Sequence, residues 1–162
     1  SSKTPCPIFT MRVIIQKSGP AKIEIDHKVH NEISKGLVIL LGITHSDTEK
    51  DIDYLVEKIA NLRLFPEADS FFEKSVLETQ QEILLISQFT LYASCKKGRR
   101  PDFIEAANPD IAKPLYEKFA EKLTAKGLKV KTGVFGADMN ISLINQGPIT
   151  IIMDSLQSKQ RL

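Results

Sequence analysis

Apolar and polar residues follow one another along this chain in patterns that predict strands near its start. The segment 12–17 (RVIIQK) is typical of a buried strand, and the segment 21–25 (AKIEI) alternates as a strand with one wet face does. Because residues 18–20 (SGP) between them have the composition of a turn, we expect a hairpin-like pair. The segment 37–43 (LVILLGI) is apolar on both faces and predicts a central strand.

The next element has the spacing of an amphipathic helix. Apolar residues recur at helical intervals from Ile52 to Leu62, and Ser46 followed by Glu49 makes a capping box before them. We expect the segment 65–66 (FP) to end this helix, because proline disfavours helical geometry in the residue before it. Residues 67–81 are weakly patterned and predict a loop with a short strand.

The second half of the chain predicts one strong strand, a helix and the closing strands. Residues 82–92 (EILLISQFTLY) are typical of a long buried strand. Asn108 followed by Pro109 opens a helix that ends at Gly127. The residues that this helix would direct inward are Ile111, Leu115, Phe119 and Leu123. We expect the closing strands at 128–132, 139–144 and 149–154, with a turn at 145–148 between the last two.

These elements predict a single domain of the α+β class, with a largely antiparallel, barrel-like β-sheet core and two main helices. At 162 residues, with 42% hydrophobic and 26% charged residues, the chain can bury a core without a metal or a disulfide. We expect the folded domain to span residues 11–155. Residues 1–10 would be a disordered leader or an expression remnant, and residues 156–162 a flexible tail.

Charge and cysteine content narrow the function classes. Lys and Arg number 22 against 20 Asp and Glu, so the net charge of +2 does not by itself indicate a nucleic-acid-binding protein. Cys6 and Cys95 lack the spacing of metal ligands, so we expect neither a zinc site nor a disulfide scaffold, and a cytoplasmic location. The longest apolar run, 37–43, is far shorter than the roughly 20 residues that span a bilayer, so we expect no membrane partner.

The sequence contains none of the familiar cofactor or hydrolase motifs. It has no glycine-rich dinucleotide motif, no P-loop, no GxSxG elbow and no HExxH motif, and we expect no cofactor. His27 and His30 could share a metal, but no third ligand lies near them in sequence. Solvated loop histidines are the simpler interpretation, and we expect no metal site.

A group of polar residues interrupts the apolar segment 82–92. Ser87, Gln88 and Thr90 lie there, with Phe89 among them. The two hydroxyls can simply bond to neighbouring backbone, or the group can position a substrate at the end of a rigid strand. No His, Asp or Glu adjoins them, so a hydrolase built on these residues would find its base elsewhere in the fold or in the substrate.

Two further segments are candidates for function. Gly147-Pro148 is either a plain hairpin turn or one of the few bonds where a cis peptide costs only about 0.5–1 kcal/mol. The basic run that follows the polar residues is either a solvated loop or a phosphate contact. It comprises Lys96, Lys97, Arg99 and Arg100.

Three motifs taken together resemble one family, the D-aminoacyl-tRNA deacylases of the bacterial and eukaryotic type. They are 87–91 (SQFTL), 133–139 (GVFGADM) and 145–150 (NQGPIT). Shorter matches at 11–16, 35–37 and 97–101 occur in the same order, so the resemblance runs from about Met11 to Ser155. The Ser-Gln opening of the first motif fits this branch better than the related animal deacylases, which carry proline there.

The resemblance implies a homodimer with active sites at the subunit interface. The implied reaction is hydrolysis of the ester that joins a D-amino acid to the terminal adenosine of tRNA, a proofreading step in translation. The catalytic residues would be Ser87, Gln88 and Thr90. Phe89, Ala137, Met139, Gly147 and Pro148 would bind the substrate, and Lys96, Lys97, Arg99 and Arg100 would bind the tRNA. Thr90 is either the nucleophile or a bystander to catalysis by the 2′-hydroxyl of the terminal ribose, and the lack of an adjoining base favours the hydroxyl.

In this family Gly147-Pro148 would be a cis dipeptide that enters the partner's site and reads chirality. Its rigid carbonyls would exclude an L side chain while accepting many D side chains and glycine. Lys17 departs from the family, which usually carries arginine there, and lysine lacks arginine's planar fork. If that arginine holds the Gly-Pro loop, the cis geometry is in question. The alternative to an enzyme is a non-catalytic tRNA- or RNA-binding module that uses the basic run.

Overall fold

The computed structural model describes residues 10–156. The predicted leader and tail fall almost wholly on residues 1–9 and 157–162, which lie outside the described residues. Thr10, at the end of the predicted leader, is buried, and its carbonyl accepts a hydrogen bond from the hydroxyl of Tyr92. No helix within residues 10–156 is both long and apolar enough to cross a membrane.

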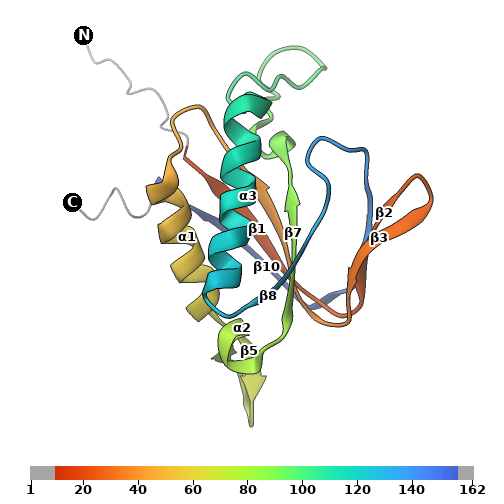
Figure 1. Ribbon diagram of the computed structural model, residues 1–162, viewed down its shortest axis with the longest axis vertical. Helices are drawn as coiled ribbons and strands as arrows, with labels where there is room; N and C mark the ends of the chain where they lie inside the picture. The colour runs from red at the N-terminus through yellow and green to blue at the C-terminus, as the bar shows by residue number, and fades with distance from the viewer. Residues whose placement is uncertain (1–9, 157–162) are drawn as a thin grey trace.

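A mixed sheet forms the centre of the fold (Figure 1). Within residues 10–156 it has five strands, in the order β10-β1-β4-β7-β8. They are β1 (Arg12–Ser18), β4 (Gly36–Gly42), β7 (Glu82–Ser87), β8 (Lys129–Thr132) and β10 (Asn145–Asp154). β1 pairs antiparallel with β4 and β10, whereas β7 pairs parallel with β4 and β8. The α+β class is confirmed. The five-stranded sheet is mixed rather than largely antiparallel, because a helix lies between the two strands of each parallel pair and returns the chain to the same end of the sheet. Over all the described strands, antiparallel pairs still outnumber parallel ones.

Two helices cover one face of this sheet and bury the main core (Figure 1). They are α1 (Glu49–Asn61) and α3 (Pro109–Ala125). Ile52, Leu55 and Ile59 of α1 and Phe119 and Leu123 of α3 are fully buried. The expected caps differ in detail: α1 begins two residues later than Ser46 would place it, since the capping box is formed by Thr48 and Asp51, with Asp51 Oδ2 accepting from the backbone N of Thr48 at 2.8 Å. Ile111, expected to face inward, is exposed.

A smaller sheet packs against the other face, beside β7 and β8. Its order is β3-β2-β9, formed by β2 (Ala21–Ile25), β3 (Lys28–Ile33) and β9 (Asn140–Ser142). Ile23 of this sheet packs with Leu84 and Ile86 of β7 in a second apolar cluster. The expected hairpins of 12–17 with 21–25 and of 139–144 with 149–154 are not formed, because each pair divides between the two sheets. The sheets do not close into a barrel in the described residues, so that expectation was also wrong.

The weakly patterned region holds more regular structure than a loop. It forms the hairpin of β5 (Arg63–Glu67) and β6 (Ser70–Ser75), followed by the short helix α2 (Val76–Thr79). Pro66, expected to end the preceding helix, lies inside β5, and the helix ends before it at Asn61. A strand tolerates proline here because β5 pairs with β6 alone, and so has a free edge in the described residues.

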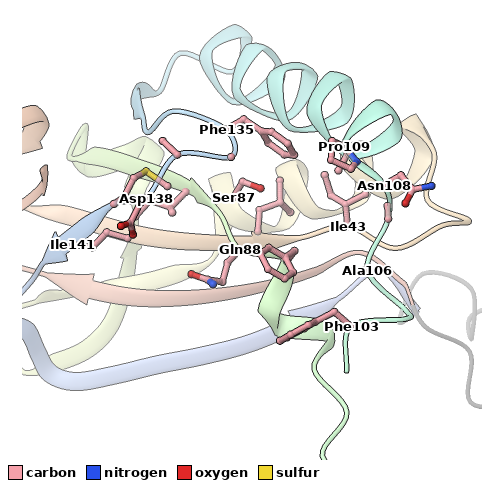
Figure 2. Close-up of a pocket in the computed structure, with 18 residues that line it drawn as sticks. Ile43, Ser87, Gln88, Phe103, Ala106, Asn108, Pro109, Phe135, Asp138 and Ile141 are labelled. Carbon is pink, nitrogen blue, oxygen red and sulfur yellow. The ribbon is translucent and has the colours of Figure 1, made fainter. Parts of the chain in front are cut away.

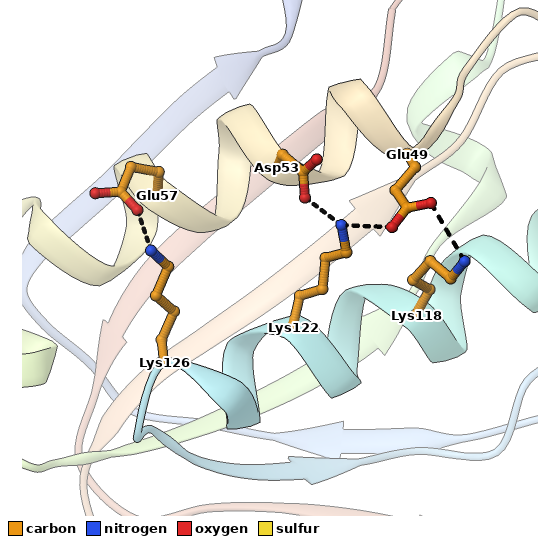
Figure 3. A network of polar contacts seen from close by, with 6 residues as sticks. All are labelled: Glu49, Asp53, Glu57, Lys118, Lys122 and Lys126. Carbon is orange, nitrogen blue, oxygen red and sulfur yellow. Dashed lines mark hydrogen bonds and ion pairs between the residues drawn. The ribbon is translucent and has the colours of Figure 1, made fainter.

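A ladder of ion pairs joins the exposed sides of α1 and α3 (Figure 3). Lys122 Nζ lies 2.7 Å from a carboxylate oxygen of Glu49 and also contacts Asp53. Lys118 pairs with Glu49 at 3.4 Å, and Lys126 pairs with Glu57. The hydrogen bond that Lys122 donates lowers the pKa of Glu49, and the hydrogen bonds that Lys122 donates to Asp53 and Glu49 raise its own pKa.

Replacing Lys122 with methionine is expected to lower the melting temperature by about 1–3 °C at neutral pH and low salt, since exposed pairs contribute little. Carboxylates with lowered pKa values stabilise the fold above their unfolded pKa, and this contribution is lost as the pH falls through the folded value. The difference between Lys122→Met and the wild type should therefore shrink at acidic pH and in high salt. Thermal unfolding at two pH values and two salt concentrations measures this, with Lys50→Met, on an exposed position of α1, as the control.

Candidate active site

The polar residues lie where the strand β7 gives way to a tight turn. β7 ends at Ser87, and Phe89–Tyr92 forms a 3₁₀ turn, η1, so the expected strand over 82–92 is only half right. The backbone N of Gln88 still donates to the carbonyl of Leu41 at 2.8 Å, which holds the start of η1 against β4. Ser87, Gln88, Phe89 and Thr90 are thus displayed at the carboxyl end of two parallel strands.

Close packing and buried hydrogen bonds fix η1 from behind. A Cβ on Gly42 would lie 2.9 Å from the ring of Tyr92 and 3.1 Å from Cβ of Leu91, so the turn can approach β4 only because this residue is glycine. Arg12 Nη1 donates to the carbonyl of Leu91 at 3.0 Å, and the guanidinium lies over the Tyr92 ring. Burial raises the pKa of Tyr92 far above its usual range, so its hydroxyl stays protonated and donates to the carbonyls of Thr10 and Gly42.

A pocket of about 540 Å³ opens beside this turn (Figure 2). Ser87, Gln88 and Phe89 form one wall. The opposite wall comes from the loop after β8 and from the start of α3, including Phe135, Ala137, Asp138, Met139, Asn108 and Pro109. The floor is apolar and is formed by residues such as Leu41, Ile43, Ile86, Ala107 and Ala112. An apolar pocket with few polar groups at its edge is the usual form of a small-molecule site.

The second family-like motif reaches the pocket because the 133–139 loop is tightly folded. A Cβ on Gly133 would lie 2.7 Å from Sδ of Met139, so the Met139 side chain packs directly against the backbone at this glycine. Tyr116 donates from its hydroxyl to the carbonyl of Leu85 at 2.7 Å, and burial raises the pKa of Tyr116 to about 12. Its ring also contacts that of Phe135, so α3 supports both β7 and the loop.

The polar groups at the pocket can orient a substrate but are poorly suited to activating a hydroxyl. Gln88 donates from its amide Nε2 to Oγ1 of Thr90, and an amide N–H cannot take a proton from that hydroxyl. Thr90 is exposed beside the pocket. The one ionisable side chain among the described residues that line the pocket is Asp138, on the far wall. The arrangement therefore fits binding and polarisation of an ester better than nucleophilic attack by Thr90.

The Gly147-Pro148 bond is cis, and this segment does not line the pocket of its own subunit. The two residues are exposed and lie in a bulge of β10. Asn145 pairs with Ser18 and Thr150 pairs with Gln16, so β10 has extra residues between two pairs that are only two residues apart on β1. Asn145 fixes the bulge, since its Oδ1 accepts from the backbone N of Ile149 and its Nδ2 donates to Thr150, both at 2.8 Å. The cis geometry occurs with lysine at position 17, whose Nζ lies 5.4 Å from the centre of the Phe65 ring.

The remaining candidates lie outside the pocket. Lys96 and Lys97 line a second hollow on the other side of η1, and Arg99 and Arg100 are exposed on the loop that follows. His27 and His30 are exposed around the β2–β3 turn, and residues 10–156 contain no cluster of three or more His, Cys, Asp or Glu that could hold a metal ion. Cys95 is a free, exposed thiol.

Sequence reasoning missed several residues that build the site. Phe103 packs edge-on against Phe89, with ring centres 5.1 Å apart, and Arg12 and Gly42 hold η1 in place. Asn108 was interpreted only as a helix cap, although it also lines the pocket. The tertiary approach of these segments carries no local signal, but the glycine inside the apolar segment 37–43 was a visible sign of close backbone packing.

Known proteins and a family model match this chain over nearly its whole described length. The family model for D-Tyr-tRNA(Tyr) deacylase matches residues 14–154. A D-aminoacyl-tRNA deacylase of Bacillus thuringiensis is 51% identical over 145 residues, which cover 90% of this chain and 99% of the relative, and one of Bacillus cereus matches equally well. The chain belongs to the D-aminoacyl-tRNA deacylase family. It is thus a member of an enzyme family of hydrolases that act on aminoacyl-tRNA.

Two solved structures share the fold of this chain. A protein described as c-Myc DNA unwinding element binding protein superposes with a TM-score of 0.82 and 36% identity, covering 88% of this chain and 97% of that one. A probable eukaryotic D-amino acid tRNA deacylase superposes with a TM-score of 0.80 at 19% identity, over 90% of this chain and all of that one, which shows likeness of fold alone.

Proposed function

We propose that this deacylase hydrolyses the ester of D-aminoacyl-tRNA, releasing a free D-amino acid and tRNA, as a proofreading enzyme of the cytoplasm. The observation that carries the proposal is the pocket itself. It brings Ser87, Gln88 and Phe89 of one motif together with Ala137 and Met139 of another, from segments about 50 residues apart in the chain. The terminal adenosine of the tRNA would occupy the apolar part, leaving the ester at the polar edge beside Thr90.

The chemistry of the pocket supports a reaction assisted by the substrate. Water adds to the ester carbonyl, and the 3′ oxygen of the ribose must leave with a proton. The neighbouring 2′-hydroxyl can relay that proton, while Gln88 and the backbone of η1 orient and polarise the carbonyl. Thr90 then serves as a positioning hydroxyl, held by the amide of Gln88, and no protein nucleophile is consumed.

A second copy of the chain would complete the site. Gly147 and Pro148 are exposed and do not line the pocket of their own subunit, so they are free to act in a partner's pocket. The sheet face beside them carries an exposed apolar side chain: Ile152 of β10 is 67% exposed, next to Ile14 of β1, while the smaller sheet packs at the other end. A self-complementary contact through this face fits a homodimer in which each subunit lends its Gly-Pro segment.

Steric exclusion by that segment would reject L-aminoacyl esters without any affinity for the D side chain. A main-chain wall near Cα leaves no volume for a side chain of L configuration. Many D-amino acids should be accepted, and glycine should not be rejected, because it has no side chain to clash. The basic residues Lys96, Lys97, Arg99 and Arg100 would contact the tRNA backbone.

Deacylation of matched D-tyrosyl-, L-tyrosyl- and glycyl-tRNA by purified protein tests the proposal. We expect D-tyrosyl- and glycyl-tRNA to be hydrolysed and L-tyrosyl-tRNA to be spared by about 10²-fold or more in kcat/KM. Rates should be unchanged by a chelator. A non-catalytic RNA-binding module would instead bind all three tRNAs in a salt-sensitive manner and leave every ester intact. Glycyl-tRNA spared as completely as L-tyrosyl-tRNA would contradict steric exclusion as the basis of selectivity.

A further inference from the structure

A second hollow, of about 500 Å³, lies directly behind the turn that forms the pocket wall. Two segments of the chain separate this hollow from the pocket, and each lines both. In η1, Phe89 faces the pocket while Leu91 faces the second hollow, and in the next segment Phe103 faces the pocket while Ile104 faces the hollow. The two hollows are therefore neighbours, separated only by η1 and by the segment that holds Phe103 and Ile104.

Both segments are firmly anchored, so the second hollow has a fixed shape. Ser94 and Asp102 exchange backbone hydrogen bonds of 2.9 Å, which tie the start of the basic loop to its end. Thr44 donates from its hydroxyl to the carbonyl of Glu105. Arg12, which holds the carbonyl of Leu91, forms part of the lining.

Side chains of both charges line the hollow, and they do not pair with each other. Lys96, Lys97, Asp102 and Glu105 all line it. None of these four side chains forms an ion pair within residues 10–156. Among the described residues, Asp102 Oδ1 receives a long contact of 3.4 Å from the backbone N of Ile104. A ligand that offers an anion to the lysines and an amino group to the carboxylates would match this arrangement.

We propose that this hollow binds the nucleotide that precedes the terminal adenosine of the tRNA, and that it favours cytidine. The inference rests on the proposed function and extends it to a second subsite. Lysine binds phosphate as a point charge, and a carboxylate accepts from the N4 amino group of cytosine. Uridine presents a carbonyl oxygen at the same position, which a carboxylate repels. The apolar side chains of Leu91 and Ile104 supply a surface for the base.

Short substrates separate this subsite from the pocket. D-tyrosyl esters of adenosine, of cytidylyl-adenosine and of uridylyl-adenosine share the same reacting group and differ only in the preceding nucleotide. We expect kcat/KM to be about tenfold higher for the cytidylyl ester than for the uridylyl ester. The difference in kcat/KM between the cytidylyl ester and the adenosine ester should be larger still, because adenosine also lacks the phosphate. Asp102→Asn should reduce the cytidine-to-uridine ratio towards one, because an amide can also donate to the uridine carbonyl. The double replacement of Lys96 and Lys97 by glutamine should lower both dinucleotide rates together, because both dinucleotide esters carry the phosphate that the lysines would bind.

Matched controls and a binding measurement keep the outcomes distinct. Asp69→Asn, an exposed carboxylate in the β5–β6 turn, should leave every ratio unchanged. Equal kcat/KM for all three esters would overturn the cytidine subsite while leaving the proposed hydrolysis intact. Failure to hydrolyse any of them would refute the proposed function. In that case, titration with non-hydrolysable amide analogues of the two dinucleotides still decides the inference: equal affinities overturn it, and tighter binding of the cytidylyl analogue, abolished by Asp102→Asn, supports it.

Discussion

A D-tyrosyl ester on a tRNA that ends in 2′-deoxyadenosine is expected to be hydrolysed about 10²- to 10⁴-fold more slowly than the normal substrate, the range typical of losing a general acid or base. Thr90→Ala is expected to keep most of the wild-type rate on the normal substrate. The reason lies in the hydrogen bond to Thr90. Its hydroxyl oxygen accepts from the amide of Gln88, which cannot remove a proton, and the pocket wall opposite offers only the exposed carboxylate of Asp138 among the described lining residues.

Single-turnover deacylation of the two tRNAs by wild type and by Thr90→Ala measures both effects. Thr90→Ser serves as the matched variant, because it keeps the hydroxyl and removes only a methyl group. If Thr90 were the nucleophile, serine would rescue the rate, alanine would abolish it, and the deoxy substrate would react normally. That pattern would reverse the assignment of roles made above.

The sequence allowed much of the core to be predicted, because each buried strand carries its own apolar pattern. Segments 12–17 and 37–43 fall on β1 and β4 as expected. A further sign was overlooked: β4 and β7 are apolar on both faces and are separated by a helix, which is typical of parallel strands with both faces covered. The mixed sheet was therefore accessible from the same residues that suggested an antiparallel one.

The missed elements lack the local signals on which sequence reasoning depends. The turn between β2 and β3 places Asp26 and His27 at positive φ, and the turn between β5 and β6 does the same with Ala68. No glycine marks either turn, so both hairpins looked like loops. The ion-pair ladder, in contrast, does have a signal in the sequence. Acidic residues at 49, 53 and 57 and lysines at 118, 122 and 126 repeat every four residues on two helices.

The candidate site could be predicted as residues but not as a shape. The motifs identified Ser87, Gln88, Ala137 and Met139, and the structure brings all four to one pocket. Their meeting depends on α3, which supports the 133–139 loop through Tyr116 and lines the pocket with its first turn. The helical periodicity predicts that α3 forms. It does not predict where α3 packs on the sheet, because contacts between residues far apart in the sequence determine that position.

Ile152→Glu is expected to yield a folded single subunit whose deacylation of D-tyrosyl-tRNA falls by about 10²-fold or more, the size of effect that misplacing a site produces. Ile152 is 67% exposed on β10, on the same strand as the Gly147-Pro148 segment, so a carboxylate there costs the isolated chain little. In a homodimer through this face the same carboxylate would be buried without a partner and would separate the subunits. The site would then lack the Gly-Pro segment of the second chain.

Analytical ultracentrifugation together with the deacylation assay measures both consequences in one preparation. Phe71→Glu is the matched control, because Phe71 is 72% exposed on the β5–β6 hairpin, and it should change neither the oligomeric state nor the rate. An Ile152→Glu protein that sediments as a single subunit and still separates D- from L-tyrosyl-tRNA would show that one chain reads chirality alone. The exposed position of Gly147 and Pro148, away from the pocket of their own subunit, makes that outcome the sharpest challenge to a shared site.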